Sequence, residues 1–153
     1  MLNIEIVSGN PDGSLVLEVN GRPNNGNSSA ERNWRIHWRV RTGSNVEYIH
    51  DIKMKTKPGD PPSTNIFTSD PPASQGGPNS THWKGTVDTN APIGAVYGYS
   101  IFWKRSGGGI EECDPKISVK PSKFNFTTLL VGISFGVLGL LSLIFLFRKR
   151  GRK

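Results

Sequence analysis

Apolar and polar residues alternate one for one along most of residues 1–120, which is the periodicity of half-buried β-strands. The clearest stretch, "NWRIHWRVR", places Trp34, Ile36, Trp38 and Val40 on one face and basic residues on the other. No helical periodicity appears before residue 123. The pattern therefore predicts an all-β domain of seven or eight strands. The expected strands cover residues 2–8, 14–20, 33–41, 46–55, 65–68, 82–88, 95–104 and 112–120.

Residues 33–41 and 46–55 are expected to pair as an antiparallel hairpin around the loop Gly43-Ser44-Asn45. In this register Ile36 faces Ile52, so the inward pairs are apolar. His37 faces Asp51 on the outer side, which brings opposite charges together. A shift by one residue would set apolar side chains against charged ones, so the first register is preferred.

The alternation stops over residues 57–80, a segment rich in Pro and Gly that contains "DPP" twice. Loops of this length are uncommon in compact domains and are usually functional or disordered. We therefore expect residues 57–80 to form a partner-binding loop. The residues expected to carry this role are Asp60, Pro61, Pro62, Phe67, Asp70, Pro71 and Pro72.

A different pattern begins at residue 127, where 21 consecutive residues carry no charge. As a helix they would be roughly 30 Å long, the hydrocarbon thickness of a bilayer. The sequence predicts a transmembrane helix over 127–147, preceded by a short linker (121–126) and followed by a basic tail (148–153). Gly132, Gly136 and Gly139 recur on one side of this helix. In that spacing "TLLVGISFGVLGL" resembles glycophorin-type dimer helices, which implies association with a second copy or with another helix.

The net charge of +7 belongs mainly to the tail, because residues 1–123 contain 14 Lys and Arg against 12 Asp and Glu. This distribution argues against a nucleic-acid-binding protein and is typical of anchoring charges beside a membrane span. The residues expected to anchor the span are Lys120, Lys123, Arg148, Lys149 and Arg150.

The beginning of the chain, "MLNIEIVSGNPDGS", lacks the features of a secretory signal, so we expect a tail-anchored protein with its β domain on the cytoplasmic side. The basic tail alone favours the opposite orientation, because cytoplasmic segments beside a span are usually enriched in Lys and Arg. We favour the cytoplasmic orientation, because a folded domain of about 120 residues is difficult to export without a signal.

The closing strands have a recognisable order. "WKGTVDTNAPIGAVYGYSIFW", residues 83–103, combines a tryptophan strand, a Pro-x-Gly turn and a Tyr-x-Tyr strand. It resembles the closing strands of immunoglobulin-like and starch-binding-type sandwiches, although the Cys…Trp…Cys arrangement of antibody domains is absent. The resemblance implies that residues 1–120 form an antiparallel immunoglobulin-like β-sandwich.

The residues offer little chemistry for catalysis, and we expect no enzyme, cofactor or metal site. In the hairpin register His37 and His50 lie on opposite faces and cannot share a metal, while acidic neighbours raise the pKa of Cys113.

Two surfaces could bind a partner. One is a basic strand face that would attract anionic lipid headgroups or an acidic protein, unless it is simply a solvated surface: Arg35, Arg39, Arg41 and Lys53. The other is an aromatic set that belongs to the core unless it is exposed for stacking on sugars: Trp83, Tyr97, Tyr99 and Trp103.

These features together predict a non-catalytic interaction or scaffolding module held at a membrane surface. The alternative is an outward-facing carbohydrate-binding or surface-receptor domain, whose sequons at Asn27 and Asn79 would then be open to glycosylation. The sequence does not identify the protein partner in either case.

Overall fold

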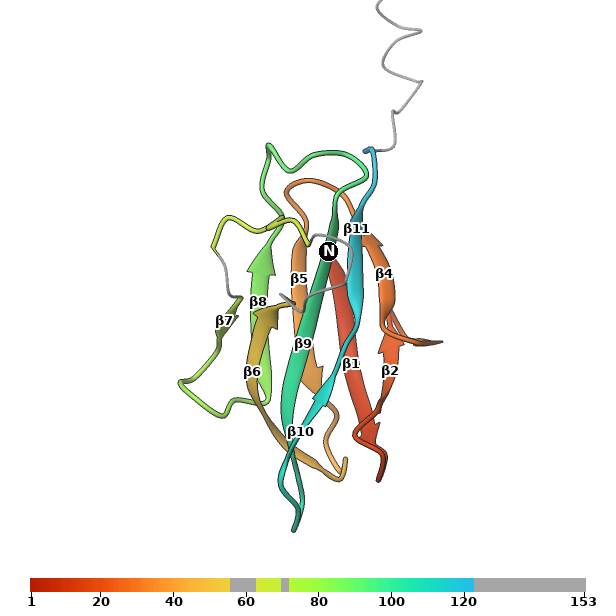
Figure 1. Cartoon of the computed structure of the whole chain (residues 1–153), viewed down its shortest axis with the longest axis vertical. Helices are drawn as coiled ribbons and strands as arrows, with labels where there is room; N and C mark the ends of the chain where they lie inside the picture. Colours follow the sequence, from red (N-terminus) through yellow and green to blue (C-terminus); the bar gives the residue numbers. More distant parts are fainter. Residues whose placement is uncertain (56–62, 70–71, 123–153) are drawn as a thin grey trace, which may run out of the picture. The chain divides into compact units, whose positions relative to one another are not determined.

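A computed structural model describes residues 1–55, 63–69 and 72–122, and residues 1–121 form one compact unit (Figure 1). The predicted all-β class is confirmed, since the described residues contain strands and no α-helix. The strands are β1 (Leu2–Gly9), β2 (Leu15–Val19), β3 (Arg22–Asn24), β4 (Asn27–Ala30), β5 (Arg35–Val40), β6 (Val46–Met54), β7 (Ala73–Ser74), β8 (His82–Thr86), β9 (Val96–Arg105), β10 (Ile110–Cys113) and β11 (Lys116–Val119).

These strands form two sheets. The first has the order β3-β2-β1-β5-β8-β7. The second is built on β9, which pairs with β6 along one edge and with β10 and then β11 along the other, and β4 follows beyond β11. The expected purely antiparallel arrangement is wrong, because β1 pairs with β5 and β11 pairs with β4 in parallel. Both sheets are therefore mixed.

The predicted hairpin between residues 33–41 and 46–55 is also wrong. β5 hydrogen-bonds to β1 and β8 in the first sheet, whereas β6 hydrogen-bonds to β9 in the second. Ile36 and Ile52 do point inward and are fully buried, as the alternation predicted. They are not cross-strand neighbours, because both edges of β5 are already paired. Alternation identifies the inward face of a strand but not the strand that lies beside it.

The core between the sheets is mostly aliphatic and includes several large aromatic side chains. Trp38 of β5 donates a hydrogen bond from Nε1 to the hydroxyl of Tyr99 on β9 at 3.1 Å, and their rings meet edge to face. This contact joins the two sheets, whose strands β5 and β9 overlap in the view of Figure 1. Near the other end of β9, the ring of Trp103 covers Gly9 so closely that an added Cβ would lie 2.0 Å from it. Only glycine allows the indole to occupy this position.

The described parts of segment 57–80 are structural. The backbone N–H of Thr64 donates to Val96 O at the start of β9, and the carbonyl of Ile66 accepts from Asp88 just after β8. The segment thus connects an end of each sheet, and it inserts Ile66 and Phe67 into the core. The strand expected over 65–68 is reduced to one bridge between Phe67 and Val87.

Candidate functional site

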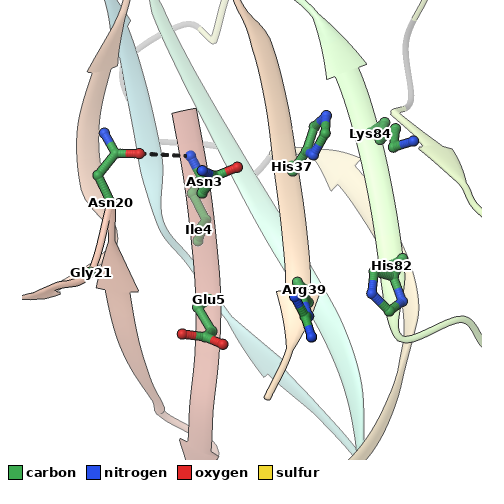
Figure 2. A pocket seen from close by; sticks show the side chains of 9 residues that line it. All are labelled: Asn3, Ile4, Glu5, Asn20, Gly21, His37, Arg39, His82 and Lys84. Carbon is green, nitrogen blue, oxygen red and sulfur yellow. Dashed lines mark hydrogen bonds between the residues drawn. The ribbon is translucent and has the colours of Figure 1, made fainter. Parts of the chain in front are cut away.

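The outer face of the six-stranded sheet carries two rows of polar side chains across β1, β5 and β8. Asn3, His37 and Lys84 lie side by side in one row, and Glu5, Arg39 and His82 in the next. Neighbouring strands are about 4.8 Å apart, and same-face positions on one strand about 6.8 Å, so these residues share a small area. They line a shallow depression with a volume of about 670 Å³ (Figure 2).

The turn between β2 and β3 forms the opposite rim of this depression. Asn20 adopts a positive φ of 50° and its side-chain oxygen accepts a hydrogen bond from the backbone N–H of Asn3 at 3.0 Å (Figure 2). Gly21 follows with φ 75°, a conformation that glycine tolerates without strain. The rim is therefore held in place by the first strand of the same sheet.

One cation of this face is fully neutralised. The guanidinium of Arg41 donates to Glu5 at 2.7 Å and to Glu18 at 2.6 Å. The hydrogen bond from Arg41 lowers the pKa of Glu5, and the two carboxylates raise the pKa of Arg41. Arg41 thus ties β1, β2 and the end of β5 together, which is a structural role.

The other cations of this face are not neutralised in this way. Arg35, Arg39 and Lys84 form no ion pair with any residue in the described part of the chain, and all three are exposed. Burial is the main cause that lowers the pKa of His37, and the nearby charges of Lys84 and Arg35 add to the effect. The outer face therefore has a surplus of positive charge centred on β5 and β8.

The predicted basic face is only partly correct. Arg35 and Arg39 lie on β5 and Arg41 directly follows it, but Lys53 lies on β6 in the other sheet. There Lys53 pairs with Asp51 at 2.9 Å and lies over the ring of Phe102. Lys53 would share this face only if β6 formed a hairpin with β5, and β6 pairs with β9 instead.

Sequence reasoning missed His82 and Lys84 as members of this face. The alternation in "HWKGTVD" puts Trp83 inward, and it therefore puts His82 and Lys84 outward. The alternation does not show which strand lies beside β8. The pairing of β8 with β5 brings His82 beside Arg39 and Lys84 beside His37.

The aromatic set is entirely in the core. Trp83 is 6 % exposed, and Tyr97, Tyr99 and Trp103 are fully buried. The expectation that this set belongs to the core is therefore confirmed, and the alternative of an exposed platform for sugars is not. These side chains instead supply the apolar surface that holds the two sheets together.

The expected partner-binding loop divides into two kinds of residue. Phe67 and Pro72 are buried, so their side chains do not form an exposed recognition surface, and this part of the expectation is wrong. Asp60, Pro61, Pro62, Asp70 and Pro71 lie outside the described residues.

The residues predicted for the membrane are mostly outside the described part as well. This applies to Lys123, Gly132, Gly136, Gly139, Arg148, Lys149 and Arg150. Lys120 is described, and its ammonium group lies 4.8 Å from the centre of the Trp34 ring and 3.9 Å from Glu31. Across the residues that the structure describes, no helix is long and apolar enough to cross a membrane, and the predicted span 127–147 lies outside them.

The remaining titratable groups are dispersed. His37 and His50 lie in different sheets, and His50 contacts the side-chain oxygen of Asn79 at 2.8 Å. Within the described ranges no three His, Cys, Asp or Glu side chains are grouped so that they could hold a metal ion. Cys113 is half-buried, and burial is the main cause that raises its pKa.

No protein-family model matches the chain, and no curated protein matches it. Function therefore has to be inferred from the residues and their geometry.

Proposed function

We propose that this chain is a single-pass membrane protein whose immunoglobulin-like β-sandwich is a non-catalytic binding module held at the cytoplasmic membrane surface. Its binding surface is the outer face of the six-stranded sheet. The span is residues 127–147, and the domain recruits or scaffolds an anionic partner beside it.

The observation that carries this proposal is the unpaired charge on one face. Arg35, Arg39 and Lys84 stand on adjacent strands and form no ion pair among the described residues, although Arg39 lies opposite Glu5, whereas Arg41 beside them pairs with two carboxylates. An uncompensated cluster of cations costs free energy in the free protein, and an anionic partner offsets this cost.

Two further observations bear on the alternative of sugar recognition and on the form of the fold. The large aromatic side chains are used in the core, which leaves no stacking platform of the predicted set. Two sheets around one hydrophobic core, with tyrosines 97 and 99 on β9, support the immunoglobulin-like form of the sandwich.

The orientation can be tested with a membrane-impermeant maleimide in sealed right-side-out vesicles, which enclose the cytoplasmic side of the membrane. Cys113 is a poor target because it is half-buried and its pKa is raised, so the reporter is Thr42→Cys in a Cys113→Ser background. We expect labelling only after permeabilisation. Labelling of intact vesicles, together with glycans on the exposed residues Asn27 and Asn79, would place the domain outside and refute the cytoplasmic orientation.

The binding face can be tested by site-specific photo-crosslinking in native membranes. A photoreactive residue replacing His82 should give discrete adducts, because His82 is exposed and lies beside Arg39 on the proposed face. The same residue at position 53, exposed on the other sheet, is the matched control. Equal adducts from both positions, or none from position 82, would contradict the assignment of this face.

A further inference from the structure

We propose that His37, Arg39, His82 and Lys84 form a binding site for a phosphomonoester group. This inference rests on the proposed function in one respect, since it places the ligand on the same face and names its chemistry. It concerns a single doubly charged oxyanion, supplied by a lipid headgroup or by a soluble phosphate ester.

The positions of the four side chains suit such a group. His37 is the direct neighbour of Lys84, and Arg39 is the direct neighbour of His82, on two adjacent strands. The four therefore form the corners of a patch about 5 Å by 7 Å. All four side chains line the same depression, two from each strand (Figure 2).

The donors at these corners are the ones that bind phosphate in proteins. A guanidinium offers two parallel N–H groups to two oxygens of one phosphate, and an ammonium adds a mobile point charge. Imidazole donates a further hydrogen bond from either nitrogen and gains a charge when it is protonated. The site thus combines two permanent cations with two imidazole rings, of which His37 Nε2 is covered and His82 Nδ1 already contacts the hydroxyl of Thr81 at 2.9 Å.

The charge around the patch favours an anion. The nearest carboxylate in the register is Glu5, beside Arg39, but its hydrogen bond goes to Arg41. Neither Arg39 nor Lys84 has an ion pair among the residues that the structure describes. Arg39 is partly compensated, because it lies opposite Glu5 and its charge helps to lower the pKa of that carboxyl. The three cations Arg39, Arg41 and Lys84 still outnumber the two carboxylates Glu5 and Glu18, so a dianion would meet a net positive charge.

His37 provides a second, independent indication. Its Nε2 is covered by protein atoms, and no hydrogen-bond partner for it exists in the described part of the chain. A buried polar atom without a partner is costly, and most such atoms in proteins have one. A phosphate oxygen can supply the missing partner only if the atoms that cover Nε2 move aside, so binding requires a local rearrangement around His37.

The depression is also of the right kind for a headgroup or a small ester. Its volume of about 670 Å³ lies in the range of small-molecule sites, and it is open to solvent. A phosphate needs only part of this space. The remainder can hold the group that carries the phosphate, towards Asn20 and Gly21.

The test uses the full chain in micelles of a non-ionic detergent, with inorganic phosphate as the probe at constant ionic strength. We expect saturable shifts of the backbone amide signals of the four residues, with millimolar affinity for this minimal probe. Arg39→Gln and Lys84→Gln should each weaken binding by about threefold to tenfold. Lys53→Gln, which removes the same charge from the other sheet, should leave the affinity unchanged.

The source of the phosphate is distinguished in nanodiscs. If phosphatidic acid in the disc removes the response to added phosphate, the site is occupied by a headgroup. If the response is the same in discs of neutral lipid and of phosphatidic acid, the ligand is a soluble phosphate ester. Either result supports the site.

Shifts that do not saturate, or that Lys53→Gln reduces as much as Lys84→Gln, would overturn the proposal. Failure of the phosphate site can be distinguished from failure of the proposed function. Adducts at position 82 without phosphate binding would remove only the phosphate site, and phosphate binding with an outward-facing domain would remove only the cytoplasmic orientation.

Discussion

Replacing Phe67 by alanine should severely destabilise the domain, although this residue lies in a segment that looks like a loop. Its side chain is 3 % exposed, and its ring packs edge to face on Tyr97 at 4.9 Å and on Trp38 at 5.9 Å. Truncation of a buried Phe to Ala typically costs about 3–5 kcal/mol, which includes the lost ring contacts. Small domains are stable by only about 5–15 kcal/mol, so the variant should be marginal or unfolded.

The assay is urea unfolding of the full chain in mild detergent, followed by tryptophan fluorescence. All four tryptophans precede residue 121, so the signal reports only the β domain. Phe67→Leu, which keeps part of the apolar volume, should lower the midpoint less. The control Thr68→Ala changes an exposed neighbour and should stay within about 0.5 kcal/mol of the parent. A midpoint for Phe67→Ala equal to that control would refute the packing described above.

A double-mutant cycle tests the same contact from the other side. A Cβ at Gly85 would lie 2.9 Å from two atoms of the Phe67 ring, so Gly85→Ala should cost about 1–3 kcal/mol. In the Phe67→Ala background this cost should largely disappear, because the ring that blocks the methyl group is gone. An equal cost in both backgrounds would show that Phe67 does not pack on Gly85.

Three more predictions follow from other contacts. The pKa of His37 in the folded domain lies below its ordinary value of 6.5, so the unfolded chain binds the proton first. Stability should therefore be fully present above about pH 6.5 and decline as the pH falls below it, and His37→Gln should flatten that decline in a series of urea titrations. Gly9→Ala should lower the melting temperature, because its Cβ would fall 2.0 Å from the Trp103 ring, and an unchanged value would contradict this packing. Tyr99→Phe should cost about 1–3 kcal/mol by leaving Trp38 Nε1 without its acceptor. Trp38→Phe should cost less in the Tyr99→Phe background than in the parent, by about the free energy of this hydrogen bond, and fully additive losses would argue against the pairing.

Much of the core could be predicted from the sequence, because burial follows local alternation. Ile36, Trp38 and Val40 are buried as expected, and so is the aromatic set of β8 and β9. Strands β3 and β4 could not be predicted in this way. Residues 22–30 are polar and rich in Asn, and they join the sheets through backbone pairing to β2 and β11 rather than through an apolar face.

The candidate site was only half predictable for a different reason. Arg39 was identified from its own strand, but His82 and Lys84 become its neighbours only through the pairing of β5 with β8, more than 40 residues apart in the chain. The expected hairpin instead favoured a local partner for β5 and brought in Lys53. The part of segment 57–80 around Phe67 was misjudged because a two-residue apolar insertion has no periodicity to recognise.

The outermost strands have a consequence for how copies of the protein meet. β3 has three residues and contains Pro23, β7 has two residues, β4 and β10 have four each, and β6 is interrupted by two register shifts. Short, bulged or proline-containing edges are poor templates for the strand of another molecule. If the chain is confined to a bilayer, lateral crowding will raise the rate at which these edge strands collide. The edge strands nevertheless provide few regularly spaced backbone groups with which a neighbouring strand could pair. Crowded copies should therefore resist β-aggregation, and ordered self-association would have to use side-chain surfaces or the predicted span.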